Sequence, residues 1–139
     1  MSGPVVDSSP EDWNRQIAIH LGSAYLVTRA FIPLLRLEQG AIVLFSSQAA
    51  LPGASIAEMS AYAIAKTAVA TLVRAIAEEE RVNGVRANAL APAAIRTATN
   101  LATMGANVRY VERDQVAATV TFLCSDQAKA ISGVLLPLA

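Results

Sequence analysis

A tyrosine and a lysine four positions apart are the side chains of this sequence best suited to proton transfer. Tyr62 and Lys66 fall in an alanine-rich stretch that is expected to be helical, where positions four apart share one face. An ammonium group beside a phenol favours the phenolate, which makes a tyrosine a usable acid or base near neutral pH. Ser47 follows an apolar run just upstream, and its hydroxyl could hydrogen-bond a substrate oxygen. The three residues predict a site that polarises a carbonyl and transfers a proton to it.

The first elements expected around these residues are a helix and a strand. A helix should begin at Ser9-Pro10-Glu11-Asp12, which offers a capping hydroxyl, a proline at the first helical position and two carboxylates at the positive end of the dipole. Its apolar face continues to Arg36, and Gly40 ends it. The uninterrupted apolar run Ala41–Phe45 predicts a strand buried on both faces of a parallel sheet.

A second helix and a second strand are expected next. The alanine-rich helix should span about 58–82, and its charged end, Glu78–Glu80, should be solvated. A short strand is expected over 85–90, with Pro92 ending it. The stretch 93–111 has little pattern and predicts a mobile loop with a helical turn or two.

The chain should close with one more helix and strand. Asp114 is expected to cap a helix reaching Cys124, and 134–136 should form the last strand. Helix and strand in alternation are typical of an α/β layered fold, here a single domain over residues 1–139. Open α/β sheets bind ligands beyond the carboxyl ends of their strands, which is where Ser47 is expected.

Composition argues against several classes of function. Eleven basic and eleven acidic side chains give a net charge near zero without any Lys/Arg cluster, so nucleic acid and anionic membrane surfaces are poor partners. The single cysteine, Cys124, allows no internal disulfide and no Cys/His zinc site, and we expect it to be buried and inert in a reducing cytoplasm. The longest uncharged stretch, 39–57, contains proline and glycine, and the N-terminus does not read as a secretion signal, so we expect no membrane span.

An ordered set of segments is more specific than the Tyr62–Lys66 spacing alone. It comprises the apolar strand with Ser46-Ser47, then Ser60-Ala61-Tyr62-Ala63-Ile64-Ala65-Lys66, Val85-Arg86-Ala87-Asn88-Ala89-Leu90-Ala91-Pro92, Ile95-Arg96-Thr97 and Ile131-Ser132-Gly133-Val134. This combination resembles the short-chain dehydrogenase/reductase family over nearly the whole chain. The resemblance implies a partial Rossmann-like, doubly wound parallel sheet, made of about the last three strands with their helices.

The resemblance also implies roles for individual residues. Ser47 would polarise the carbonyl and Tyr62 would exchange the proton, while Lys66 would favour the phenolate. Tyr62 and Lys66 would also bind the nicotinamide ribose. The residues expected to meet the nicotinamide itself are Pro92, Ile95 and Thr97. The cofactor would be NAD or NADP, the substrate a small-molecule ketone or secondary alcohol, and no metal is implied.

Three features depart from the family pattern. The family opens with a strand and a glycine-rich turn for the cofactor pyrophosphate, whereas no glycines here are spaced as G-x-G-x-x-G, so the chain is expected to be a C-terminal catalytic half without that segment. His20 stands where the family usually has an asparagine that holds a water for a proton relay. Its imidazole could hold that water, relay protons itself, or only pack in the helix. Ala93 stands where the family has a glycine after the proline.

Three hypotheses follow for function. The first is an NAD(P)-dependent oxidoreductase that interconverts a ketone and a secondary alcohol. The second is a non-catalytic subunit that uses the helices at 10–36 and 58–82, which form the main dimer interface in the resembled family, to pair with a full-length partner. The third is cofactor-free acid/base chemistry with Ser47 and Tyr62. Because a sheet without its first strands leaves Ala41–Phe45 with an unpaired apolar edge, we also expect a homo-oligomer or a complex with a full-length homologue.

Overall fold

The first long helix begins where the sequence predicts. The structure, a computed structural model, describes residues 3–139, and in it the Ser9 Oγ accepts a hydrogen bond from the Asp12 backbone N–H at 3.0 Å. Helix α1 (Pro10–Ile17) continues through a π-helical segment (Ala18–Gly22) into α2 (Ser23–Glu38). Gln39 ends the helix in a left-handed conformation, with φ of 50°. The helix therefore runs two residues beyond the expected end at Arg36.

Three parallel strands form the central sheet, in the order β1-β2-β5. Their bounds are β1 Ala41–Phe45, β2 Arg86–Pro92 and β5 Leu135–Leu138. Leu44 of β1 lies opposite Ala89 of β2, and Pro92 of β2 lies opposite Leu138 of β5. The predicted α/β class and parallel sheet are confirmed, except that β2 includes Pro92 as its last residue. A proline is tolerated there because only the final ladder position loses a donor.

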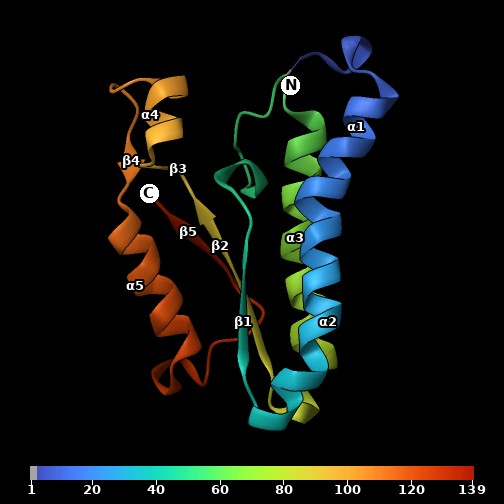
Figure 1. Cartoon of the computed structure of the whole chain (residues 1–139), viewed down its shortest axis with the longest axis vertical. Coiled ribbons are helices and arrows are strands. Elements are labelled where there is room, and N and C mark those ends of the chain that lie inside the picture. Colours follow the sequence, from blue (N-terminus) through green and yellow to red (C-terminus); the bar gives the residue numbers. More distant parts are fainter. Residues whose placement is uncertain (1–2) are drawn as a thin grey trace.

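Helices cover both faces of this sheet (Figure 1). α2 and α3 (Ser60–Glu79) lie on one side, and α5 (Arg113–Cys124) lies on the other. Alternate residues of β2 pack against the helices on the two faces of the sheet, because successive side chains of a strand point to opposite faces. Ala87 and Ala89 cluster with Val69, Val73 and Ile76 of α3, whereas Leu90 clusters with Val116 and Leu123 of α5. The small alanines of β2 let α3 approach the sheet closely.

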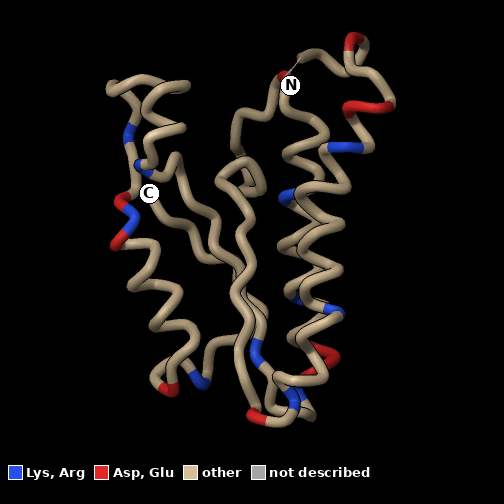
Figure 2. Tube along the Cα trace, in the orientation of Figure 1, with Lys and Arg blue, Asp and Glu red and all other residues tan. Residues whose placement is uncertain are grey.

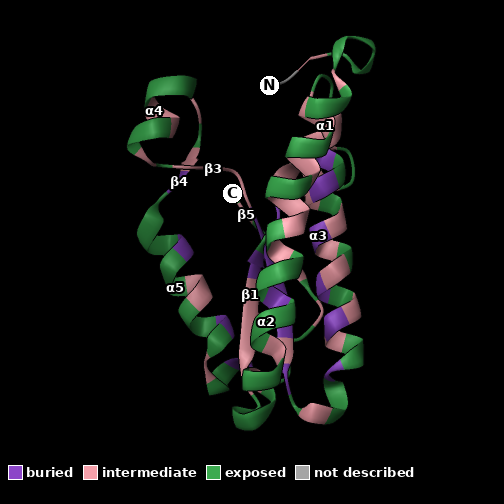
Figure 3. Cartoon of the chain, turned by 45° about the vertical axis from the view of Figure 1, so that its right-hand side comes forward, coloured by how far each residue is buried: buried purple, intermediate pink, exposed green. Residues whose placement is uncertain are grey.

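β1 is the exception to the predicted burial. Only Leu44 among its five residues is buried, most of β1 has intermediate burial in Figure 3, and Phe45 is 43% exposed. The prediction that Ala41–Phe45 is buried on both faces is therefore wrong. The reason is position, because within residues 3–139 β1 pairs only with β2 and lies at the edge of the sheet.

The stretch 93–111 is more regular than its sequence pattern predicts. It contains β3 (Ala94–Ile95), α4 (Ala98–Met104) and β4 (Tyr110–Val111), and β3 pairs with β4 in a second, two-stranded parallel sheet. The predicted cap of the next helix is also wrong, because Glu112 rather than Asp114 is the N-cap of α5 and forms a capping box with Gln115. α4 agrees with the predicted helical turn or two, whereas the two strands were not predicted, because elements this short show no hydrophobic period.

An ion pair between the buried Glu80 and the half-exposed Arg36 joins the C-terminal ends of α2 and α3. The Glu80 carboxylate accepts hydrogen bonds from Arg36 Nε at 2.7 Å, from Arg36 Nη2 at 2.6 Å and from Asn83 Nδ2 at 2.8 Å. Glu80 is 3% exposed, so the prediction of a solvated helix end holds only for Glu78 and Glu79. A bidentate charged pair of this kind fixes the two helix ends relative to each other.

The surface combines mixed charge with an uncovered apolar strip. Basic and acidic residues are mixed at both ends of the molecule, with fewer charges in between (Figure 2). Two helical segments, Pro10–Glu38 and Ser60–Glu79, are long and apolar enough to cross a membrane by length and composition alone. The second packs apolar residues against the sheet, as the core helix of a globular domain does. The first exposes Leu26, Val27, Phe31, Leu34 and Leu37, a set that we call the α2 apolar face.

Candidate active site

A cavity of about 660 Å³ lies at the carboxyl ends of β1 and β2 and brings together the three residues that the sequence singled out. Ser47, Tyr62 and Lys66 all line it. Ser47 lies just beyond the end of β1, and the first two turns of α3 supply Tyr62 and Lys66. A larger cavity of about 1080 Å³ lies at the opposite, amino ends of the strands and contains none of the predicted site residues. The smaller cavity is therefore the candidate site.

The two serines after β1 differ in their contacts: Ser46 holds the backbone in place, and Ser47 keeps a free hydroxyl hydrogen. The buried Ser46 donates its hydroxyl to the Lys66 carbonyl at 2.8 Å and its N–H to the Leu90 carbonyl at 2.7 Å. These bonds tie the end of β1 to α3 and to β2. Ser47 Oγ accepts a hydrogen bond from the Ala49 N–H at 3.2 Å, which leaves the hydroxyl hydrogen of Ser47 free to donate. Sequence reasoning missed the positioning role of Ser46, although the paired serines at a strand end were a signal.

Lys66 is anchored at the end of β1. Its Nζ donates to the Phe45 carbonyl at 2.9 Å and lies 5.8 Å from the centroid of the Tyr62 ring. An ammonium has three donors, so two remain for other acceptors. Burial lowers the pKa of Lys66, because desolvation penalises the charged form. The ammonium is thus held beside the phenol by a backbone acceptor that no side-chain substitution removes.

His20 lies against Tyr62 but is not among the residues that line the cavity. The two rings meet edge to face, with their centroids 5.0 Å apart. His20 belongs to the π-helical segment, a helix irregularity that occurs often at functional sites. Burial, and then the nearby Lys66 charge, lower the pKa of His20 below its usual 6.5. The imidazole is therefore neutral near pH 7, with both a donor and an acceptor nitrogen.

Of the three residues expected at the nicotinamide, two line the cavity and one does not. Pro92 and Ile95 line the cavity, and so does Ala93. Thr97 does not line it, and its Oγ1 instead accepts the Asn100 N–H at 3.1 Å as the N-cap of α4. The Ile95 carbonyl accepts a bond from Asn100 Nδ2 at 2.7 Å, which leaves one of its lone pairs for another donor.

These residues fit one end of a nicotinamide cofactor. The remaining Lys66 donors and the Tyr62 hydroxyl suit ribose hydroxyls, and Pro92 and Ile95 offer backbone groups at the cavity wall. The cradle for a pyrophosphate is a different requirement, since it needs closely spaced glycines. The described glycines, at 3, 22, 40, 53, 84, 105 and 133, are not spaced in that way.

Two further side chains in the cavity wall were not anticipated from sequence. Asn100 and Met104 of α4 line it together with the residues contributed by α3. No pattern in the sequence marks these two residues, because the stretch 93–111 carries no hydrophobic period. Cys124 is a further correction, since it is exposed at the end of α5 rather than buried.

Known proteins are similar in sequence to this chain. A profile of the family described as Enoyl-(Acyl carrier protein) reductase matches residues 1–138. The chain is 33% identical over 142 residues to protein FixR of Bradyrhizobium diazoefficiens, with 94% of this chain and 49% of FixR covered. It is 34% identical over 144 residues to a tropinone reductase homologue of Arabidopsis thaliana, with 95% of this chain and 53% of that protein covered.

A solved structure shows the same fold. The 3-ketoacyl-(acyl-carrier-protein) reductase of Brucella melitensis, complexed with NADH, matches with a TM-score of 0.84 at 26% identity, covering 99% of this chain and 60% of that one. The chain spans about half the length of the curated relatives it matches. From the family profile and these relatives, the chain belongs to the short-chain dehydrogenase/reductase family, as the resemblance in its sequence implied.

Proposed function

We propose that this chain carries the catalytic part of an NAD(P)-dependent oxidoreductase that interconverts a ketone and a secondary alcohol. The observation that carries the proposal is the common cavity of Ser47, Tyr62 and Lys66. Further support comes from relatives whose names describe carbonyl reduction, among them the tropinone reductase homologue and the 3-ketoacyl reductase bound to NADH.

The proposed chemistry assigns one task to each side chain. Ser47 donates its free hydroxyl hydrogen to the substrate carbonyl oxygen, and Tyr62 transfers its phenolic proton to the same oxygen. Lys66, held by the Phe45 carbonyl, stabilises the phenolate that remains. The neutral His20 imidazole, whose ring meets the Tyr62 ring edge to face, is placed to relay a proton back to the phenolate, donating from one ring nitrogen while the other accepts a proton from solvent. NAD(P)H, when bound, supplies the hydride for the carbonyl carbon.

The residues that would hold the cofactor are those around the cavity mouth. Tyr62 and Lys66 would bind the ribose, with Pro92, Ile95 and Thr97 near the nicotinamide. Since Thr97 already caps α4, a contact with the carboxamide would use the hydroxyl hydrogen that the cap leaves free. The pyrophosphate contacts would have to come from outside the described residues.

We further propose that the chain works as a homo-oligomer or in a complex with a full-length homologue. The unpaired edge of β1 and the α2 apolar face both support this, because each leaves pairing or apolar surface uncovered. The same surfaces would serve a non-catalytic pairing subunit, which remains the alternative. A reducing, cytoplasmic location is likewise our proposal, supported by the single exposed thiol of Cys124.

The test is a titration of the purified chain with NADH and NADPH, followed by nicotinamide fluorescence, with turnover of a generic ketone. Binding together with turnover that Tyr62→Phe abolishes would support the oxidoreductase. Absence of binding by either cofactor would favour the pairing subunit. Turnover that needs no nicotinamide would point instead to cofactor-free acid/base chemistry.

A further inference from the structure

Helix α4 forms one wall of the candidate cavity. Asn100 and Met104, both on α4, line the same space as Ser47 and Tyr62. α4 has only seven residues, and isolated helices of that length are not stable in water. The wall must therefore be held in place by contacts from other elements.

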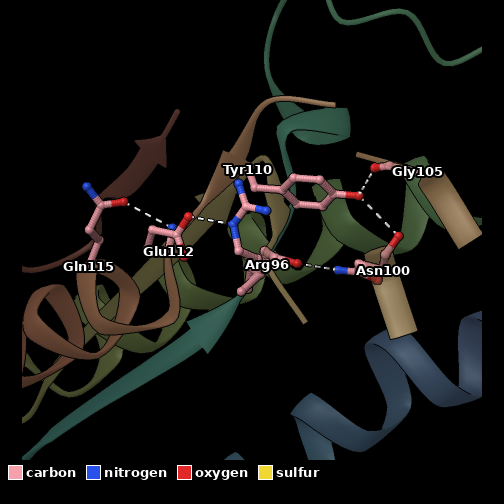
Figure 4. Close-up of polar contacts among 7 residues, drawn as sticks. Arg96, Asn100, Gly105, Tyr110, Glu112 and Gln115 are labelled. Atoms are coloured by element: carbon pink, nitrogen blue, oxygen red, sulfur yellow. Dashed lines mark hydrogen bonds and ion pairs between the residues drawn. The ribbon is translucent and has the colours of Figure 1, made fainter. Parts of the chain in front are cut away.

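Tyr110 bonds to α4 at two places, the Asn100 carbonyl in its first turn and the Gly105 carbonyl just past its end. Its hydroxyl lies 2.7 Å from the Gly105 carbonyl and 3.1 Å from the Asn100 carbonyl, so that one phenolic hydrogen is shared between two acceptors (Figure 4). Tyr110 belongs to β4, which pairs with β3 at the cavity rim and places Ala94 opposite Tyr110. At its N-terminal end, α4 is also fastened by the Thr97 cap.

The Tyr110 ring is itself anchored to the rest of the fold. The Arg96 guanidinium lies 4.9 Å from the ring centroid, and Arg96 Nε donates to Glu112 Oε1 at 2.6 Å (Figure 4). Glu112 in turn caps α5 through its capping box with Gln115. A chain of contacts thus links the start of α5 to the end of α4 through Tyr110.

We propose that Tyr110 is a positioning residue that holds α4 as a fixed wall, and that Met104 on this wall is a specificity-determining residue. Met59 faces the same cavity from the start of α3, and among the described residues that line it Lys66 alone is charged, with its ammonium already bonded to the Phe45 carbonyl beside Tyr62. A cavity of this chemistry takes an uncharged ketone whose apolar substituent packs against Met59 and Met104. The assignment of a ketone rests on the function proposed above. The two hydrogen bonds from the Tyr110 hydroxyl to the Asn100 and Gly105 carbonyls, which we call the Tyr110 latch, do not depend on that function.

Hydrogen–deuterium exchange tests the latch without any ligand. Tyr110→Phe keeps the ring against Arg96 but removes the hydroxyl, and we expect the amides of the last turn of α4 to exchange about fivefold faster. Tyr25→Phe is the matched control, because Tyr25 is exposed and its hydroxyl makes no hydrogen bond within the described residues. Equal exchange of α4 in the wild type and in Tyr110→Phe would overturn the latch.

Methyl NMR tests the consequence for the cavity. The chain has three methionines, and ¹³C-methyl labelling separates the signals of Met59 and Met104, which both line the site. We expect Tyr110→Phe to move the Met104 signal toward its unfolded position and to leave the Met59 signal in place. A general loss of stability would move both signals or neither, and either result would contradict a positioning role.

The same labelled protein then reports on the ligand. Adding cyclohexanone should shift both methyl signals in the wild type and only the Met59 signal in Tyr110→Phe, whereas pyruvate at the same concentration should shift neither. A larger response to pyruvate would overturn the assignment of an uncharged, apolar ligand. No response to any ketone, with the exchange result still positive, would count against the proposed function and the ligand assignment while leaving the latch intact.

Discussion

The ammonium of Lys66 is bonded to the carbonyl oxygen of Phe45, the last residue of β1, at 2.9 Å. This contact joins the helix that carries Tyr62 to the strand that delivers Ser47. Since the acceptor is a backbone carbonyl, no substitution of the Phe45 side chain removes this bond.

Lys66→Met should therefore remove the charge while the cavity keeps its shape. We expect turnover of a ketone by the cofactor-loaded assembly to fall by about 10²-fold or more, because the phenolate loses its nearest cation. Steady-state kinetics with the melting temperature measured in parallel is the check. Retention of near wild-type turnover by a folded Lys66→Met protein would remove lysine from the mechanism.

A second prediction concerns the Arg36–Glu80 pair at the helix ends. Glu80→Gln leaves Arg36 without its charged partner, and the melting temperature should fall by several degrees. Glu79→Gln, an exposed neighbour, is the control and should melt close to the wild type. Equal melting of the two variants would show that the pair contributes nothing.

The same pair predicts an acid dependence with a definite sign. Hydrogen bonds from Arg36, and to a lesser degree from Asn83, lower the pKa of Glu80 below its usual 4.5 against the opposing effect of burial. A lowered carboxyl pKa gives stability that is present above 4.5 and is lost as pH falls through the folded-state pKa. Denaturant unfolding at a series of acidic pH values should show this loss in the wild type and a smaller one in Glu80→Gln.

Much of the site could be predicted from sequence, for identifiable reasons. Tyr62 and Lys66 lie on one regular helix, whose period fixes their relation, and Ser47 follows a strand whose apolar run marks its end. Elements of this kind are specified by local patterns. The same logic gave the helix start at Ser9, where the cap is a contact within one turn.

The remaining features depend on contacts that leave no local pattern. Glu80 meets Arg36 across 44 positions of sequence, and Arg86 donates to carbonyls near residues 123–131. Tyr110 bonds to Gly105 and Asn100 through a stretch with no period. The exposure of Phe45 depends on which strands are neighbours of β1, which the residues of β1 cannot encode.

The pKa of His20 gives a prediction that an NMR titration can test. It is the only histidine, so a proton NMR titration follows its imidazole without ambiguity. Its pKa should lie below 6.5, because burial first, and the Lys66 charge second, disfavour the imidazolium. In Lys66→Met the His20 pKa should rise, since the second cause is removed. A value at or above 6.5 in the folded wild type would contradict the placement of His20 against Tyr62.

The lowered pKa of His20 also has a consequence for stability. Between the folded-state pKa and 6.5 the unfolded chain binds more protons than the folded one, so the free energy of unfolding rises with pH in that window. This contribution is fully present above 6.5 and is lost as pH falls. His20→Asn should flatten that part of the profile, and an unchanged profile would mean that His20 titrates alike in both states.

The α2 apolar face gives the last prediction. Leu34 is 59% exposed, so Leu34→Glu should leave the fold intact while placing a carboxylate in any contact that this face makes. Tyr25→Glu is the matched control: Tyr25 is on the same helix and 51% exposed, but it lies nine positions away, on a different side. Sedimentation should give the wild type and Tyr25→Glu a mass above the 14.5 kDa of one chain, and Leu34→Glu a mass close to it.

A wild-type monomer at all concentrations would leave the edge of β1 uncovered and contradict the proposed assembly. An assembly that survives Leu34→Glu would instead place the contact on the β1 edge alone.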